Sequence, residues 1–422
     1  MSRLALLPSE PIRPKMAGIG IRYLEMARRL PRPGLDVVLV TAGDPAEVPS
    51  DLPVADVRRF ERGALAALLD DCDAVVGQGQ LMNDLLIEVP SLPTMVDLYD
   101  PWLVENLSYV DTLGLDPYRN DHATWVLQMS RGDFFLCSCE EQRQFYIGFL
   151  AALGRVNPYR VADDPDLSGL IDVVPFGIST ELSAHEPVLP PVEDGVRRLL
   201  FGGLYDWYDP WPVLDALETL DRPDWHLLLI RNPNPGSTPQ RLFDQVESWC
   251  RQRGWWQERV KVLDWLPAAR RWDLLRDVDL VVSTHLPSVE THLSLRTRFL
   301  DALAAECPVI ATEGGGMSRL LREHDAGWLV PPGDPAAVAT ALTEILKGEA
   351  GVVQRRATHG RELLEAFTWP RVLEPVVRFA TQPRRDPTKE DFAFRATTHS
   401  PPDSLRFRAK RWLRRQLGRN AS

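Results

Sequence analysis

Residues 308–318 read Pro308-Val-Ile-Ala-Thr-Glu-Gly-Gly-Gly-Met-Ser318. The apolar first half is typical of a buried strand in a parallel sheet, and a helical pattern begins at Met317. Three glycines, Gly314, Gly315 and Gly316, separate the two. Glycines at such a junction let an anion or a sugar approach the backbone N–H groups at the start of a helix, although they also occur in turns that are only flexible. This stretch predicts a strand-turn-helix unit with a ligand at its turn.

The same alternation of short apolar runs and longer amphipathic stretches continues in both directions, which is the pattern of an α/β protein with parallel sheets. A second series of strands is expected at residues 198–201, 226–230, 260–263, 280–283 and 309–312. A first series is expected at residues 37–41, 74–77, 94–98, 134–137 and 172–175.

These two series divide the chain into two α/β domains. The stretch Pro187-Val-Leu-Pro-Pro-Val-Glu-Asp-Gly195 lies between them and has the composition of an inter-domain linker. We therefore expect an N-terminal domain at residues 1–185 and a C-terminal domain at 186–365. A further helix is expected at 366–381, followed by a Pro-rich linker and a basic tail at 382–422.

Composition and charge exclude several classes of protein. The chain has 422 residues, 44% of them hydrophobic and 25% charged, which is typical of a soluble globular protein rather than a disordered or fibrous one. The net charge is −11 even though residues 405–419 are strongly basic, so the body of the chain is a poor match for nucleic acid. No apolar run suggests a membrane span and five scattered cysteines suit a reducing compartment, so a cytoplasmic location is expected.

Two further segments carry groups that suit a phosphorylated ligand. Phe201-Gly202-Gly203-Leu204 follows an expected strand directly, although a lone glycine pair is more often only a turn. Arg296 and Arg298 are forked cations suited to a pyrophosphate, and Glu290 and Asp301 are acceptors suited to sugar hydroxyls. The alternative is a solvated helix start with ordinary i,i+3 ion pairs.

At this point the residues resemble a known family, the retaining glycosyltransferases of GT-B architecture, specifically glycosyltransferase family 4. The resemblance rests on the glycine turn at 202–204, the stretch Glu290 to Ala305, the strand and glycines at 308–315, and Gly327-Trp-Leu-Val-Pro-Pro-Gly-Asp-Pro335. In the first half, residues 14–22, 131–140 and 173–178 resemble the glycine loop, the strand before a Ser-Glu turn and the step into the linker.

The resemblance implies two Rossmann-like domains that face a central cleft, with the acceptor on the first and a nucleotide-sugar donor on the second. It implies transfer of a hexosyl-type sugar with retention, without a metal or other cofactor, to a glycan, a lipid-linked molecule or a small molecule. The donor-binding residues would be Gly202, Gly203, Arg231, Arg296, Arg298, Asp301 and Gly314–Gly316, and Gly18 and Gly20 would form a loop at the cleft.

The family's N-terminal His is absent here, where the chain reads Val96-Asp97-Leu-Tyr-Asp100-Pro-Trp102. Asp97 or Asp100 would face the cleft in its place, unless they only cap a turn before Pro101. Glu290 would hold hydroxyls of the donor sugar. The family's two glutamates stand eight positions apart, whereas Glu290 and Asp301 are separated by eleven.

Two alternative functions remain open from the sequence. One is a GT-B sugar-nucleotide epimerase, and the other is a catalytically silent scaffold that binds a nucleotide sugar or a glycan.

The tail carries a separate expectation. Residues 405–419 place Leu405, Ala409, Trp412, Leu413 and Leu417 on one helical face and basic residues around the rest, as in a helix that lies on an anionic membrane. A solvated basic tail is the alternative.

Overall fold

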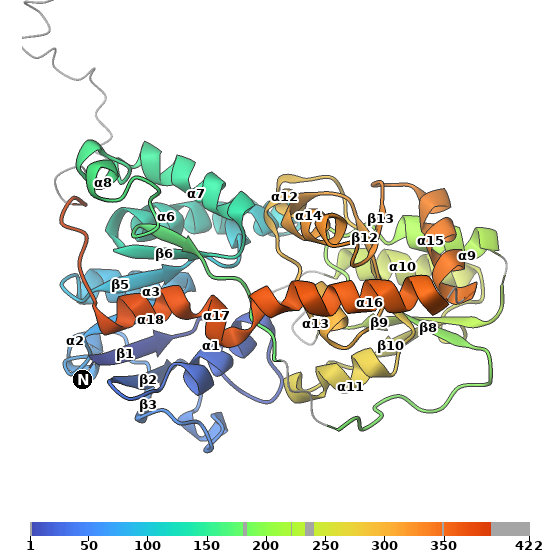
Figure 1. Ribbon diagram of the computed structural model, residues 1–422, viewed down its shortest axis with the longest axis horizontal. Helices are drawn as coiled ribbons and strands as arrows, with labels where there is room; N and C mark the ends of the chain where they lie inside the picture. The colour runs from blue at the N-terminus through green and yellow to red at the C-terminus, as the bar shows by residue number, and fades with distance from the viewer. Residues whose placement is uncertain (1, 180–183, 221, 233–239, 348–349, 390–422) are drawn as a thin grey trace, which may run out of the picture.

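The computed structural model describes residues 2–179, 184–220, 222–232, 240–347 and 350–389. Two parallel sheets lie side by side, each covered by helices (Figure 1). The predicted α/β class with two Rossmann-like sheets is confirmed.

The N-terminal sheet has seven parallel strands in the order β3-β2-β1-β4-β5-β6-β7. Its strands are β1 Ser2–Leu7, β2 Leu35–Thr41, β3 Asp56–Arg59, β4 Ala74–Gly77, β5 Thr94–Asp97, β6 Phe134–Cys137 and β7 Ile171–Val173. Its helices are α1 Gly18–Arg29, α2 Leu65–Leu68, α3 Gly79–Glu88, α4 Trp102–Glu105, α5 Val110–Leu113, α6 Asp116–Arg131, α7 Glu140–Ala152 and α8 Pro158–Asp163, with 3-10 turns η1 Pro45–Glu47 and η2 Asn106–Tyr109.

The C-terminal sheet has six parallel strands in the order β10-β9-β8-β11-β12-β13. Its strands are β8 Arg197–Gly202, β9 Trp225–Ile230, β10 Val260–Leu263, β11 Leu280–Ser283, β12 Val309–Thr312 and β13 Trp328–Val330. Its helices are α9 Trp211–Leu220, α10 Arg241–Gln252, α11 Arg271–Arg276, α12 Val289–Leu293, α13 Thr297–Ala304, α14 Gly315–Glu323, α15 Pro335–Lys347 and α16 Ala350–Leu364, with the 3-10 turn η3 Ala268–Arg270.

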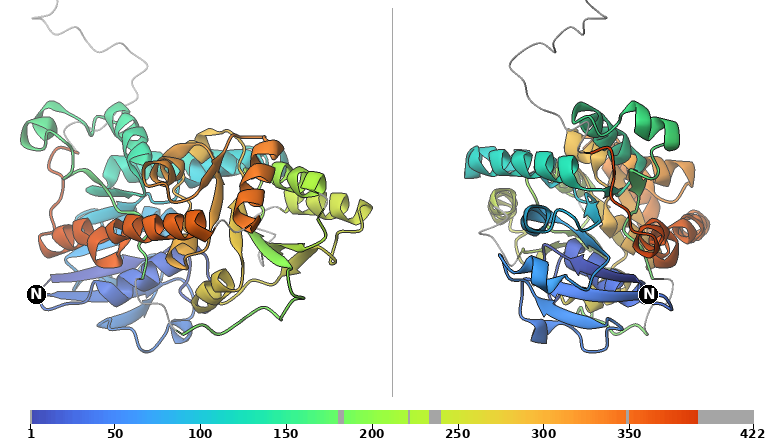
Figure 2. Two further views of the ribbon diagram at one scale, coloured as in Figure 1. Left: turned by 45° about the vertical axis from the view of Figure 1, so that its right-hand side comes forward. Right: turned by 90° about the vertical axis from the view of Figure 1, so that its left-hand side faces the viewer.

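After α16 the chain crosses back to the first domain through the 3-10 turn η4 Glu365–Phe367, α17 Trp369–Val372 and α18 Glu374–Thr381. Figures 1 and 2 show this run as an orange-to-red band that joins the two domains. Trp369 packs on Phe176, and a Cβ at Gly177 would meet the Trp369 ring at 2.3 Å, so only glycine fits there. The two chain crossings are therefore packed against each other.

The central strands form because they are apolar on both faces. In β1, Leu4 and Leu6 pack into a core that continues beneath α1 and α17, whereas Ala5 and Leu7 pack with α3 on the opposite face. The first of these cores also includes residues of the second sheet, such as Val281. Burial of apolar surface therefore stabilises the two domains jointly.

The expected linker at residues 187–195 is not a free connection. The backbone N–H groups of Val188 and Leu189 both donate to Asp277 Oδ2, at 2.7 and 2.9 Å. The N–H of Glu186 donates to Asp273 Oδ1 at 3.1 Å. This segment therefore lies along α11 and is held by its carboxylates.

The expected linker that starts at residue 382 is wrong for its first part. Residues 382–389, the C-terminal strap, pack on the N-terminal domain, and Asp386 and Lys389 are 4% and 8% exposed. Asp386 accepts from Arg155 at 2.8 Å and pairs with Arg160 at 2.8 Å, and Lys389 donates to Asp133 at 2.7 Å. Ion pairs between distant residues, rather than apolar contacts, hold this segment. The rest of the expected linker and the basic tail at 405–419 lie outside the described residues.

Candidate active site

The site lies at the carboxyl ends of the parallel strands, where the two domains face each other. In the C-terminal sheet the strand order reverses between β8 and β11, and such switch points are where open α/β sheets bind ligands. A pocket of about 150 Å³ lies there. It is lined from the N-terminal domain by Tyr99, Asp100, Pro101 and Glu105, and from the C-terminal domain by Trp207, Tyr208, Ser294, Leu295, Arg296, Thr297 and Arg298.

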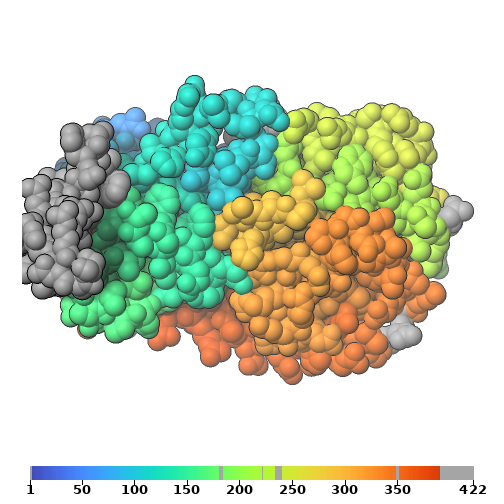
Figure 3. Space-filling model, turned by 90° about the horizontal axis from the view of Figure 1, so that it is seen from above, coloured from blue at the N-terminus to red at the C-terminus, as the bar shows by residue number. Residues whose placement is uncertain are grey.

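The two domains are in direct contact around this pocket. Glu141 on α7 pairs with Arg319 on α14 at 3.0 Å, and the Cys139 thiol donates to the carbonyl of Leu293 at 3.4 Å. Figure 3 shows the gold segment of the C-terminal domain pressed against the cyan and teal segment of the N-terminal domain. The structure therefore shows the cleft with its walls touching.

Glu290 and Arg296 bind each other. Glu290 is 2% exposed, and the Arg296 guanidinium donates to both of its oxygens at 2.6 Å. Ser294 Oγ adds a third hydrogen bond at 2.8 Å. The structure brings the two predicted residues together as a bidentate pair, so each satisfies the charge of the other. Their roles toward donor hydroxyls and diphosphate stay predictions.

Arg298 ties the first glycine turn to the site. Its guanidinium donates to the carbonyl of Phe201 at 2.7 Å and to the hydroxyl of Tyr208 at 2.6 Å. Gly202 has φ +84°, which favours glycine, and a Cβ there would lie 3.3 Å from the Arg298 guanidinium. The arrangement places a cation directly beneath the turn where the sequence predicts a phosphate. Gly203 follows and packs against the ring of Tyr205.

The triple glycine lies at the domain interface. Gly314 and Gly315 have φ +137° and +68°, and a Cβ on Gly315 would meet the carbonyl of Thr291 at 2.5 Å. A Cβ on Gly316 would lie 2.7 Å from the carboxylate of Glu141. Gly315 is therefore required for the close approach of α12, and Gly316 lies against the Glu141 side chain of α7. This is a packing reason that the sequence analysis did not foresee. An anion-binding role stays a prediction.

Asp100 and Glu105 form a second carboxyl pair in the pocket. The two side chains are hydrogen-bonded to each other. Burial raises the pKa of both carboxyls, and the negative charge of Glu290 opposite raises them further. The pair therefore holds a proton more readily than two exposed carboxylates would. Glu105 was missed by sequence reasoning, although a carboxylate on a short helix five residues after Asp100 was a usable signal.

Asp97 takes a different place from the one expected. It is 1% exposed and accepts from Arg22 Nε at 2.8 Å and Nη2 at 3.2 Å. Arg22 also donates to the carbonyl of Pro175 at 2.8 Å. The pair thus joins α1, β5 and the end of the first domain, and Asp97 does not line the pocket.

The remaining predicted residues lie around the pocket rather than in it. Arg231 pairs with Glu247 at 3.2 Å and covers the ring of Phe243, which directs it toward α10. The N–H of Gly20 donates to Glu10 at 2.8 Å, so this carboxylate caps the start of α1, and Gly18 lies near the hydroxyl of Tyr99.

Asp301 provides a test through pH. Burial raises its pKa to about 6, and Arg271 at 3.4 Å opposes this only in part. Because the folded-state pKa lies above the unfolded value of about 3.9, folding takes up a proton, and this group costs stability as the pH rises from about 4 to above 6. The unfolding free energy of Asp301→Asn minus that of the wild type should therefore increase by about 2 kcal/mol from pH 4.5 to pH 8. Urea unfolding at both pH values measures this, and an equal difference at the two would contradict the assigned cause.

The described residues contain no group of three or more His, Cys, Asp or Glu side chains placed to hold a metal ion. Within the same part of the chain, no helix has the length and apolar character needed to cross a bilayer.

Comparison with solved structures defines the class of fold. Sucrose-phosphate synthase from Thermosynechococcus elongatus aligns with 90% of this chain and 99% of its own, with a TM-score of 0.66 and 16% identity. The Anabaena protein HepE in complex with UDP-glucose covers 90% of this chain and 98% of its own, with a TM-score of 0.62 and 16% identity. The two-domain arrangement is that of the GT-B fold, as predicted.

Sequence comparison then gives the family of the second domain. Residues 199–348 match the family described as Glycosyl transferases group 1. Phosphatidyl-myo-inositol mannosyltransferase of Mycobacterium leprae is 26% identical over 213 residues, 49% of this chain and 52% of that protein. The chain thus matches about half the length of that relative. Residues 199–348 thus form a glycosyl transferases group 1 domain, which confirms the predicted resemblance to GT-B glycosyltransferases, and transfer with retention stays a prediction.

Proposed function

We propose that this protein transfers a glycosyl group from a nucleotide-sugar donor to a hydroxyl of an acceptor. The C-terminal domain would bind the donor, and the N-terminal domain would bind the acceptor. The observation that carries the proposal is the pocket between the two domains. It sets Arg298, which contacts the Gly202 turn, opposite Asp100 and Glu105. The family match over residues 199–348 supports it.

The pocket supplies the two kinds of group that such a reaction requires. Negative charge develops on the leaving diphosphate, and a fixed cation such as Arg298 stabilises it more in the transition state than in the ground state. Because the protein provides this cation itself, we propose that the reaction uses no resident metal. On the opposite wall, the carboxyl pair of Asp100 and Glu105 can accept a hydrogen bond from an acceptor hydroxyl. Retention of configuration remains part of the proposal on the strength of the motif resemblance.

Ligand screening and donor turnover test the proposal together. A thermal-shift screen with UDP, GDP, ADP and TDP should show one preferred nucleotide, because a ligand at about 100 Kd adds roughly 2.7 kcal/mol of stability. The matching nucleotide sugars should then release nucleoside diphosphate slowly without acceptor, as water replaces it. Binding without any release would favour the silent scaffold, and recovery of an epimerised donor would favour the epimerase.

Our proposals for the acceptor and for the location of the enzyme rest on the basic tail, residues 405–419. We propose that residues 405–419 bring the protein to an anionic membrane surface, which would suit a glycan or lipid-linked acceptor. Basic residues near an anionic leaflet contribute about 1 kcal/mol each. The full chain should therefore float with anionic vesicles several-fold more than with neutral ones, and a chain that ends at Pro402 should not. Equal flotation of both chains on anionic vesicles would contradict the proposal.

A further inference from the structure

A groove lies at the amino ends of β5 and β6, at the opposite end of these strands from the candidate active site. Its volume is about 520 Å³, larger than that of the pocket between the domains. Three apolar residues, Leu86, Pro90 and Leu92, form part of its lining. Thr94, Ser130, Arg131, Arg385 and Lys389 complete it, so one part of the groove is apolar and another is cationic.

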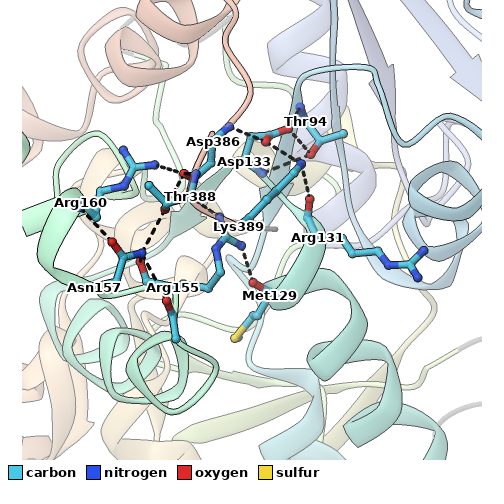
Figure 4. Close-up of polar contacts among 11 residues, drawn as sticks. Thr94, Met129, Arg131, Asp133, Arg155, Asn157, Arg160, Asp386, Thr388 and Lys389 are labelled. Atoms are coloured by element: carbon cyan, nitrogen blue, oxygen red, sulfur yellow. Dashed lines mark hydrogen bonds and ion pairs between the residues drawn. The ribbon is translucent and has the colours of Figure 1, made fainter. Parts of the chain in front are cut away.

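The described part of the C-terminal strap ends at this groove. Lys389, the last described residue, is 8% exposed and donates to Asp133 at 2.7 Å and to the carbonyl of Arg131 at 2.9 Å. Three residues earlier, burial alone would raise the pKa of Asp386, but the hydrogen bonds from Arg155 and Arg160 lower it to about 2. Figure 4 shows Asp386, Thr388 and Lys389 held between these groups. Lys389, where the described chain ends, is therefore held in place at the groove that it lines.

The residues that follow Lys389 in the sequence complement the groove: acids match its cationic part, and aromatic residues match its apolar part. The sequence continues Glu390-Asp391-Phe392-Ala393-Phe394. Two acids come first, beside a rim that carries the exposed guanidinium of Arg131. Two aromatic residues come next, and they are spaced two apart, so an extended chain would present both on one face. We propose that residues 390–394 dock in this groove, with Glu390 and Asp391 at the cationic rim and Phe392 and Phe394 on the apolar part.

The reach of the segment is sufficient. An extended chain spans about 3.3–3.6 Å per residue, so Phe392 lies within roughly 10 Å of Lys389 and Phe394 within about 17 Å. Each Phe side chain offers about 150–250 Å² of surface for burial. The docked segment would extend the strap across the amino ends of β5 and β6, and it would fix the starting point of the remaining tail on the N-terminal domain.

A cross-link measures the docking in the full chain. The five native cysteines are all buried, so an introduced exposed pair reacts selectively. Ser91, exposed between two residues that line the groove, is changed to Cys together with Ala393→Cys. A short bis-maleimide should join this pair within one chain. The matched control is Tyr159→Cys with Ala393→Cys, because Tyr159 is 65% exposed and lines the pocket on the other side of the strap.

The proposal predicts that the Ser91 pair cross-links at least fivefold faster than the Tyr159 pair. Adding Phe392→Ser and Phe394→Ser should remove this difference, whereas Phe407→Ser, the same change further along the tail, should leave it. Equal rates for the two pairs would overturn the proposal. Cross-linked dimers in place of internal links would overturn it too, and would assign the groove to a second copy of the chain.

Hydrogen exchange gives an independent readout without cysteines. In the full chain, amides of residues 86–92 should exchange at least threefold more slowly than in the variant with Phe392→Ser and Phe394→Ser. Phe407→Ser should match the wild type. Identical exchange in all three proteins would contradict docking in this groove.

Discussion

Asp97→Ala should destabilise the protein by about 3–5 kcal/mol, because it leaves the Arg22 guanidinium charged and without its carboxylate in the core. Both side chains are 1% exposed, and the pair is held by hydrogen bonds of 2.8 and 3.2 Å. Urea unfolding measures the loss. Asp84→Ala is the matched control, since its partner Arg62 is 74% exposed and such pairs contribute less than about 1 kcal/mol.

A second variant separates the structural role from a catalytic one. Changing the pair to Arg22→Met with Asp97→Leu removes both charges, and it should cost less stability than Asp97→Ala alone. If Asp97 instead contacts the substrate, Asp97→Ala would keep nearly native stability and lose donor turnover. That result would reject the structural interpretation.

Arg298→Ala should weaken binding of the preferred nucleoside diphosphate by about 30- to 100-fold. The reason is that a hydrogen bond to a charged group contributes about 1.5–3 kcal/mol, and the diphosphate is the charged part of the ligand. Binding of the corresponding nucleoside should change little. Titration calorimetry with both ligands measures the difference, and equal losses for the two would refute a role at the diphosphate.

The control for Arg298 is Tyr208→Phe. This change removes the hydroxyl that accepts from Arg298 at 2.6 Å but keeps the cation and the aromatic ring. Diphosphate affinity should fall less than fivefold. A loss as large as that of Arg298→Ala would mean that the geometry of the turn, rather than the charge, determines binding.

The sheets were predictable because strands buried on both faces appear in the sequence as continuous apolar runs. All ten expected strands are present within a few residues of their predicted bounds. Three strands were not predicted. β3 reads Asp-Val-Arg-Arg at an edge of the sheet and β13 has only three residues, so both give a weak signal. β1 does carry the apolar run Leu4–Leu7 after Ser2 and Arg3, and it was overlooked.

The strap was mistaken for a linker because its anchors are not local. Asp386 meets Arg155, a residue 231 positions earlier, and Lys389 meets Asp133, 256 positions earlier. The sequence pattern within residues 382–389 gives no indication of these distant partners. A segment rich in Pro and charge is usually solvated, and here long-range ion pairs override that composition.

The candidate site was predictable as a set of residues but not as a set of contacts. The sequence indicated that Glu290, Arg296 and Arg298 belong together. It did not indicate that Glu290 and Arg296 would bind each other, because the turn at Ser294 and Leu295 between α12 and α13 sets their geometry. It also offered Asp97 or Asp100 as the carboxylate facing the cleft. Asp100 lines the pocket, whereas the ion pair with Arg22 keeps Asp97 in the core, where Asp97 also accepts from the N–H of Tyr99 in the following turn.

Hydrogen exchange with and without the preferred nucleoside diphosphate tests the location of the donor site most directly. The account predicts slower exchange in residues 201–208, 294–299 and 312–317, which surround the pocket and the triple glycine. We expect no change in α2 and α18, which lie in the N-terminal domain and do not line the pocket. Protection confined to these helices, with none around Gly202 and Arg298, would contradict the proposed donor site.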